Sequence, residues 1–214
     1  MILNPIRFDC EKQRQISDIL ARRDLSAADW SAEDIEEIRS EIKQYYIREQ
    51  GYRCCYCNQL LLAHHGRVWD VEHVIPRSTK PNFMFEPKNL AVSCVECNGN
   101  KSAVQVTTRD YVRFTESSAN YKIVHPHFDE FDEHIEIEGD YTYHALSPKG
   151  SFTIYHCDLF RFRQREANIR QPIRDKRFER DVGELRFAKT PEEAMPIVAS
   201  IMAKLQILKD QNGD

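Results

Sequence analysis

The chain has 214 residues, of which 41% are hydrophobic and 30% are charged, and its formal net charge is -4 at pH 7. This length suits one large domain or a small core with two extensions, and the ordinary hydrophobic share excludes a chain that is disordered throughout. A stand-alone protein that coats DNA is usually basic, so the acidic total argues against that class.

The sequence carries no sign of export or of a membrane span. No stretch approaches the roughly 20 apolar residues that a transmembrane helix needs. The first residues, MILNPIRFDCEK, lack the basic and apolar regions of a signal peptide. We therefore expect a cytoplasmic protein with no membrane partner. In the cytoplasm, cysteines that are paired as CxxC bind metal more often than they form disulfide bonds.

Helices are predicted in the first quarter of the chain, which we take as an N-terminal helical extension over residues 1–51. Hydrophobic spacing indicates a short helix near the N-terminus. A longer helix is predicted after Ser31 and Asp34, because their spacing is that of a capping box. Gly51 supplies a natural C-terminal stop for that helix.

Short strands and one short helix are predicted for residues 52–115, which we take as the central domain. The runs 68–75 and 90–93 are the strand candidates, since both are rich in hydrophobic and β-branched residues. A helix is expected to begin at 95–97. This order of elements gives two strands followed by a helix.

The remaining residues, 116–214, are predicted to form a mainly helical extension that binds DNA or a partner. The segment 104–150, which overlaps the start of this extension, is expected to be irregular because it is rich in His, Asp, Glu and aromatic residues. Helical spacing runs over 158–180, where Pro172 is expected to kink or divide the helix. The cap, first-turn proline and third-position acid of a last helix are Thr190, Pro191 and Glu193.

Four of the seven cysteines form two pairs, Cys54-x-x-Cys57 and Cys94-x-x-Cys97. Two thiolates separated by two residues can turn toward one ion, and two such pairs complete a tetrahedral sulfur site, for which zinc is the usual occupant. Because four thiolates leave no open position for a substrate, we expect this zinc to be structural. The long gap between the pairs implies that a sizeable element is enclosed between them.

The enclosed segment places a carboxylate and an imidazole side by side, at Glu72 and His73. Adjacent residues of a strand point to opposite faces, so the two side chains need either a twist of the strand or separate tasks. Separate tasks suit phosphodiester hydrolysis. The Glu72 carboxylate and the side-chain carbonyl of Asn98 are oxygen ligands of the kind that Mg²⁺ or Mn²⁺ prefers. His73 can take a proton from the attacking water.

The combined pattern CxxC…EHVIP…N…CxxCNxxK resembles the HNH endonuclease superfamily, also called the His-Me finger nucleases, over residues 52–102. The resemblance implies an α+β fold: a small ββα-metal core with a structural four-cysteine zinc site, flanked by helical extensions. It also implies that His73 is the general base, that Glu72 and Asn98 bind the catalytic metal, and that Asn89 holds the strand–loop geometry around the histidine. The chain departs from the family in one respect, since Asp is commoner than Glu before the histidine.

The substrate and partners are also expected from the resemblance, which implies DNA cleavage to 5′-phosphate and 3′-hydroxyl ends. The segment 149–154 and the arginine-rich run after Leu159 look like the C-terminal part of small bacterial HNH proteins. Some of these are the nuclease subunit beside an ATPase in antiphage systems of the Septu and retron kinds, so an ATPase partner is expected. The basic residues predicted to contact nucleic acid are Lys101, Arg77, Arg163, Arg170, Arg174 and Arg177.

Two other functions fit the same sequence. The chain could be a catalytically inactive, zinc-stabilised protein that binds nucleic acid or acts as a scaffold. It could also be a nuclease directed at RNA, although no aromatic RNA-recognition motif is present to favour that reading. Metal-dependent cleavage, tested on DNA and RNA in parallel, separates the three.

Overall fold

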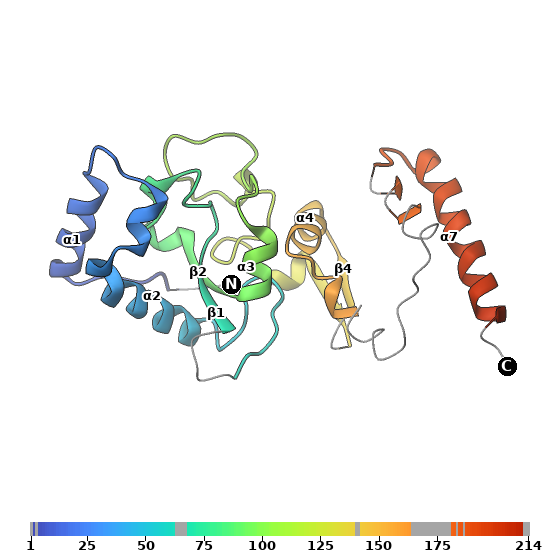
Figure 1. The fold of residues 1–214 in the computed structure, drawn as a ribbon, viewed down its shortest axis with the longest axis horizontal. Helices are drawn as coiled ribbons and strands as arrows, with labels where there is room; N and C mark the ends of the chain where they lie inside the picture. Colours follow the sequence, from blue (N-terminus) through green and yellow to red (C-terminus); the bar gives the residue numbers. More distant parts are fainter. Residues whose placement is uncertain are drawn as a thin grey trace. The chain divides into compact units, whose positions relative to one another are not determined.

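A computed structural model describes the chain as two compact units, Met1–Arg165 and Glu166–Asp214 (Figure 1). The first unit combines helices with two small antiparallel sheets, which is the α+β class that the sequence predicts. None of the described helices is both long and apolar enough to cross a membrane. The predicted division into 1–51, 52–115 and 116–214 stays a prediction. The described residues are 2, 4–62, 68–139, 142–163, 181–182, 184–185 and 187–211, of which 208–211 are described in their backbone alone.

Two helices open the first unit, α1 (Cys10–Leu20) and α2 (Glu36–Glu49). The Asp9 side chain caps α1 by accepting a hydrogen bond from the backbone N–H of Lys12. Hydrophobic residues on one face of α2 are fully buried and form a core with α1 and the neighbouring sheet. The position and direction of α2 therefore follow from its hydrophobic face rather than from a capping side chain.

The capping box predicted at Ser31 and Asp34 is wrong. The chain before α2 winds into two short 3₁₀ turns, Ala27–Ser31 and Glu33–Ile35, so Ser31 closes a turn and does not cap α2. The actual capping box lies one turn earlier, between Ser26 and Asp29. Sequence spacing alone does not distinguish the two sites, because both offer a serine followed three residues later by an aspartate.

The centre of the first unit is a pair of antiparallel strands, β1 (Trp69–His73) and β2 (Leu90–Cys94), followed at once by α3 (Val95–Lys101) (Figure 1). These elements confirm the two strands and the helix predicted from the sequence. The strands pair from Trp69 opposite Cys94 to His73 opposite Leu90. Both α2 and α3 pack against this ribbon. Side chains that alternate along β1 therefore meet different helices.

The part of the chain expected to be irregular contains a second two-stranded sheet, β3 (Ile135–Glu138) and β4 (Thr142–Ala145), and the helix α4 (Pro148–His156). A partly buried ion pair helps to fix this region, because the Lys149 ammonium group lies 2.8 Å from the buried Asp129 carboxylate. The expectation of an irregular segment is therefore wrong from Ile135 onward, whereas residues 104–134 contain no α-helix or β-strand beyond short 3₁₀ turns and isolated bridges. Strands of four residues are too short to give a clear alternation in the sequence.

The helix predicted over 158–180 can be assessed at its start alone. The backbone of Asp158 has φ +48°, which interrupts helical geometry directly after α4, and a short helical turn follows at 161–163. Residues 164–180 lie outside the described part of the chain, and so does the kink expected at Pro172.

The second unit contains the last predicted helix, α7 (Pro191–Gln211). It begins as the sequence predicts, with a proline in its first turn. The Thr190 hydroxyl accepts a hydrogen bond of 3.3 Å from the backbone N–H of Glu193, and the Glu193 carboxylate accepts one of 2.8 Å from the N–H of Lys189. The predicted cap is therefore confirmed.

A glycine at the contact between α4 and the β3 segment generates a stability prediction. A Cβ atom at Gly150 would lie 1.9 Å from the backbone oxygen of His134, and backbone cannot move aside cheaply. Gly150→Ala is expected to lower the free energy of unfolding by about 3 kcal/mol or more, measured by urea denaturation. The matched control is Gly99→Ala, since nothing lies within 4 Å of a Cβ atom there. Equal stability of the two variants would contradict the close packing at α4.

Candidate active site and metal centre

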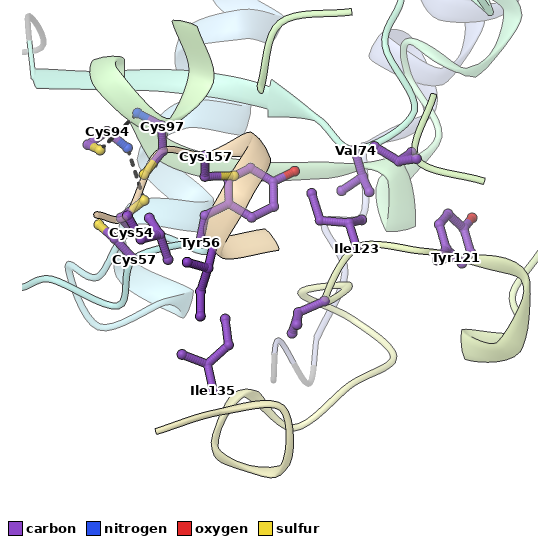
Figure 2. Packing of buried hydrophobic residues seen from close by; sticks show 14 of the residues in the cluster. Cys54, Tyr56, Cys57, Val74, Cys94, Cys97, Tyr121, Ile123, Ile135 and Cys157 are labelled. Carbon is purple, nitrogen blue, oxygen red and sulfur yellow. Dashed lines mark hydrogen bonds between the residues drawn. The ribbon is translucent and has the colours of Figure 1, made fainter. Parts of the chain in front are cut away.

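The two cysteine pairs come together in space. The sulfur atoms of Cys54, Cys57, Cys94 and Cys97 all lie within 4.8 Å of one another, and all four residues are buried (Figure 2). Backbone N–H groups turn toward these sulfur atoms. The N–H of Cys94 donates to the Cys54 sulfur and the N–H of Cys97 donates to the Cys94 sulfur, each with a nitrogen–sulfur distance of 3.3 Å. Four buried sulfurs at this spacing fit a structural metal site of the zinc type.

A buried arginine lies against these sulfurs. The guanidinium of Arg161 is 3.1 Å from the Cys97 sulfur and 3.6 Å from the Cys94 sulfur, and it also donates to the Glu96 carboxylate and the Cys157 carbonyl. Four thiolates around a divalent ion carry a net negative charge, which a buried cation offsets. No sequence pattern indicates this contact, because Arg161 follows Cys97 by 64 residues.

The residue before the predicted base, Glu72, faces the interior. Its Oε1 atom accepts hydrogen bonds from the Tyr56 hydroxyl at 3.0 Å and from the Lys101 ammonium group at 2.6 Å, and both charged side chains are 1% exposed. Burial raises the pKa of Glu72, and Lys101 followed by Tyr56 opposes that rise. Its role as a metal ligand stays a prediction. Tyr56 and Lys101 already bind its Oε1 atom, so a metal ion would have to compete with them.

Lys101 is a structural residue in this arrangement. Besides the Glu72 pair, its ammonium group donates to the backbone carbonyl of His73 over 3.0 Å. The residue is 2% exposed, so it does not present its charge at the surface. The predicted contact of Lys101 with nucleic acid stays a prediction, and the burial of its ammonium group argues against it.

Asn89 ties the end of β1 to the loop that leads to β2. Its side-chain oxygen accepts from the N–H of Ile75 over 2.7 Å, and its amide donates to the carbonyls of Ile75 and Phe83 over 3.1 and 3.0 Å. The residue is fully buried, so these three bonds satisfy an amide that water cannot reach. This geometry fits the predicted part of Asn89 in holding the loop after the histidine.

His73 is held with one ring nitrogen engaged and one without a partner. Its Nε2 lies 3.1 Å from the Met84 carbonyl oxygen, whereas its buried Nδ1 has no hydrogen-bond partner among the described residues. The Trp30 ring packs edge-on with centroids 4.4 Å apart. Burial, with a smaller contribution from Arg77, lowers the pKa of His73 to about 3. The imidazole is therefore neutral at neutral pH, and a Nε2–H donated to Met84 leaves the Nδ1 lone pair available.

One cavity is lined by this histidine, and a second cavity shares Asn98 and Arg77 with it. One of about 300 Å³ is lined by His73, Asn98 and Arg77, and another of about 550 Å³ by Asn98, Arg77 and Asp70. The Asn98 amide donates to the Asp70 carboxylate over 2.8 Å. Sequence analysis did not single out Asp70, although its place two residues before Glu72 puts both side chains on one face of β1.

The structure describes only some of the residues that are predicted to contact nucleic acid. Arg77 is half-buried and lines both cavities, and Arg163 is exposed. The other three arginines lie outside the described residues: Arg170, Arg174 and Arg177.

Two curated proteins are similar to the chain. One is a "Septu protein PtuB" of Bacillus thuringiensis, 28% identical over 113 residues that make up 53% of this chain and 38% of the relative. The other is a "Retron Vc95 putative HNH endonuclease" of Vibrio cholerae serotype O1 biovar El Tor, 27% identical over 103 residues, or 47% of this chain and 49% of the relative. The resemblance to HNH nucleases of the Septu and retron kinds is confirmed.

The matched region is less than half the length of either curated relative. No family model matches the sequence, and no solved structure matches it. The similarity therefore supports a nuclease at the level of the family, and the individual residues of the site rest on their geometry.

The contact between Arg161 and the thiols generates a prediction about metal retention. Arg161→Gln removes the cation beside Cys94 and Cys97 and is expected to weaken zinc binding about 10-fold to 100-fold, measured by competition with a chromophoric chelator. Arg163→Gln is the matched control, because Arg163 is exposed. Zinc affinity of Arg161→Gln equal to that of the control would show that the guanidinium has no part in holding the metal.

The buried pair of Glu72 and Lys101 generates a prediction about stability. Lys101→Met leaves the Glu72 carboxylate buried without its counter-charge and is expected to cost about 3–5 kcal/mol in urea denaturation. Adding Glu72→Gln to this variant should recover most of the loss, because no buried charge then remains. The control is Lys88→Met, which breaks an exposed pair with Glu116 and should cost about 1 kcal/mol or less. A double variant as unstable as the single one would contradict a charged pair.

Proposed function

We propose that the chain is a metal-dependent HNH endonuclease that hydrolyses phosphodiester bonds of DNA. The observation that carries this proposal is the state of His73: a neutral, oriented imidazole whose Nδ1 has no partner among the described residues and whose ring lines a cavity shared with Asn98 and Arg77. A buried nitrogen without a partner is costly, and such groups concentrate where a substrate or reacting water completes the site.

The proton path follows from the two ring nitrogens. Nδ1 of His73 takes a proton from a water molecule, and the resulting hydroxide attacks phosphorus as the bond to the 3′ oxygen breaks. The 3′ oxygen takes a proton from solvent, so the ends are a 5′-phosphate and a 3′-hydroxyl. Met84 keeps the ring in place throughout, because its carbonyl accepts the Nε2–H both before and after the imidazole is protonated.

A divalent ion, Mg²⁺ or Mn²⁺, would stabilise the charge that develops on the phosphate. Asn98 is the predicted ligand with the best supporting position, since it lines the same cavity as His73. Glu72 is the second predicted ligand, although Tyr56 and Lys101 already hold its Oε1 atom. Zinc is proposed for the four cysteines, where it would tie the loop before β1 to the start of α3.

Arg77 is proposed to position the substrate phosphate. It lines both cavities, and its buried Nε atom has no hydrogen-bond partner among the described residues. A guanidinium matches the oxygen atoms of a phosphate in charge and shape. Arg163 and the arginines of 170–177 stay candidates for contact with the DNA backbone.

We place this nuclease in a bacterial antiphage system in which an ATPase partner brings it to DNA. The support is the similarity to a Septu protein and to a retron HNH endonuclease. The net charge of -4 fits an enzyme whose attraction to DNA is supplied in part by another protein. Purification from the native host, followed by identification of the co-purified proteins, tests the partner.

The catalytic proposal predicts cleavage that depends on both a divalent ion and His73. Zinc-loaded protein should cut plasmid DNA with Mg²⁺ or Mn²⁺, and EDTA should abolish the reaction. His73→Ala should lower the rate by about 10²-fold to 10⁴-fold, because it removes the base. The matched control is His144→Ala, which changes an exposed histidine of β4 and should cut at the wild-type rate.

Each alternative has its own outcome in this assay. Equal cleavage by His73→Ala and wild type would refute the assigned base. Cleavage of RNA in preference to DNA would replace the substrate. A folded, zinc-loaded wild type that cuts neither, alone or with its co-purified partner, would favour an inactive binding or scaffold protein.

A further inference from the structure

The same face of β1 carries two carboxylates in contrasting surroundings. Asp70 and Glu72 both point toward α3, because side chains two residues apart on a strand share a face. Glu72 is enclosed and bound to Lys101, whereas Asp70 is half-buried and lines the larger cavity together with Asn98. One carboxylate thus has a built-in counter-charge, and the other has open space in front of it.

The contact between Asp70 and Asn98 has the dimensions of a pair of ligands. Their nearest side-chain atoms, the Asp70 Oδ2 and the Asn98 Nδ2, are 2.8 Å apart. Adjacent ligand atoms of an octahedral Mg²⁺ with bonds of about 2.05 Å lie about 2.9 Å apart. A half-turn of the Asn98 carboxamide exchanges its nitrogen and oxygen, so both side chains can offer an oxygen to one ion at nearly unchanged positions.

The surroundings of this pair suit an ion that meets a phosphate. Arg77 lines the cavity of about 550 Å³ beside Asp70 and also the cavity of about 300 Å³ beside His73. His73, which is 3% exposed, lines this second cavity, and its buried Nδ1 has no hydrogen-bond partner among the described residues. Asn98 lines both cavities. Water molecules and a phosphate oxygen could complete the coordination, because two protein ligands are enough for Mg²⁺.

We infer that Asp70, with Asn98, binds the catalytic divalent ion, and that Glu72 is the buried counter-charge of Lys101 that fixes the backbone of His73. This inference rests on the proposed function, since it names the ligand for the reaction that His73 begins. It assigns the metal to a residue two positions before the one that the HNH pattern selects.

The test measures Mn²⁺ binding by the zinc-loaded full chain, using electron paramagnetic resonance to count free ion up to millimolar concentration. Asp70→Asn is expected to weaken Mn²⁺ binding at least 10-fold, because it replaces a carboxylate by a neutral amide. The double variant Glu72→Gln with Lys101→Met removes the buried pair without leaving a buried charge and should bind Mn²⁺ within about 3-fold of wild type. Asp110→Asn changes an exposed carboxylate and serves as the control.

Each outcome decides the assignment. Wild-type affinity in Asp70→Asn, or loss of binding in the double variant alone, would overturn it, and so would a wild type that binds no Mn²⁺ in this range. Failure of the proposed function looks different. If Asp70→Asn loses the ion but wild type does not cut DNA, the site stands and the nuclease proposal falls. If cleavage depends on His73 while Asp70→Asn binds Mn²⁺ normally, the nuclease stands and Asp70 is not the ligand.

Discussion

The contact among four cysteine sulfurs fixes the frame in which every other site residue is placed. One pair belongs to the loop before β1, and the other spans the junction of β2 and α3, so the cluster joins two segments that are far apart in sequence. Asn98 follows the last of these cysteines directly, and Lys101 lies one turn further along the same helix. Without this cluster the position of α3 against β1 would rest on the contacts of Asn98 and Lys101, because seven residues form a weak helix on their own.

The ribbon of β1 and β2 separates two chemical environments. On the side of α3 lie the polar contacts, where Glu72 meets Lys101 and Asp70 meets Asn98. On the other side the N-terminal helices and Trp30 form a hydrophobic wall, against which the ring of His73 packs. The hydrophobic wall keeps the imidazole of His73 neutral. The polar side supplies oxygen atoms for the metal ion, so the proposed base and the proposed metal ligands come from different faces of the ribbon.

Much of the centre could be predicted from the sequence because its signals are local. The strands, the helix after Cys94 and the two cysteine pairs follow from short patterns, and the cluster of sulfurs confirms what the spacing indicates. The structural role of Lys101 and the contact of Asp70 with Asn98 could not be read in this way, since each depends on which residues of β1 and α3 meet. Arg161 was out of reach for the same reason, because its partners are distant in sequence.

The alternation of side chains along β1 makes this site depend on chain length as well as on residue type. Removing or inserting one residue within the strand would turn Asp70 and Glu72 toward the hydrophobic wall and His73 toward α3, while every residue of the motif remained present. Relatives should therefore tolerate changes of composition in β1 more readily than changes of its length. Changes of length are better tolerated in the stretch between β1 and β2. The hydrogen bonds of Asn89 to Ile75 and Phe83 hold the ends of this stretch, so an added loop would leave the strand register unchanged.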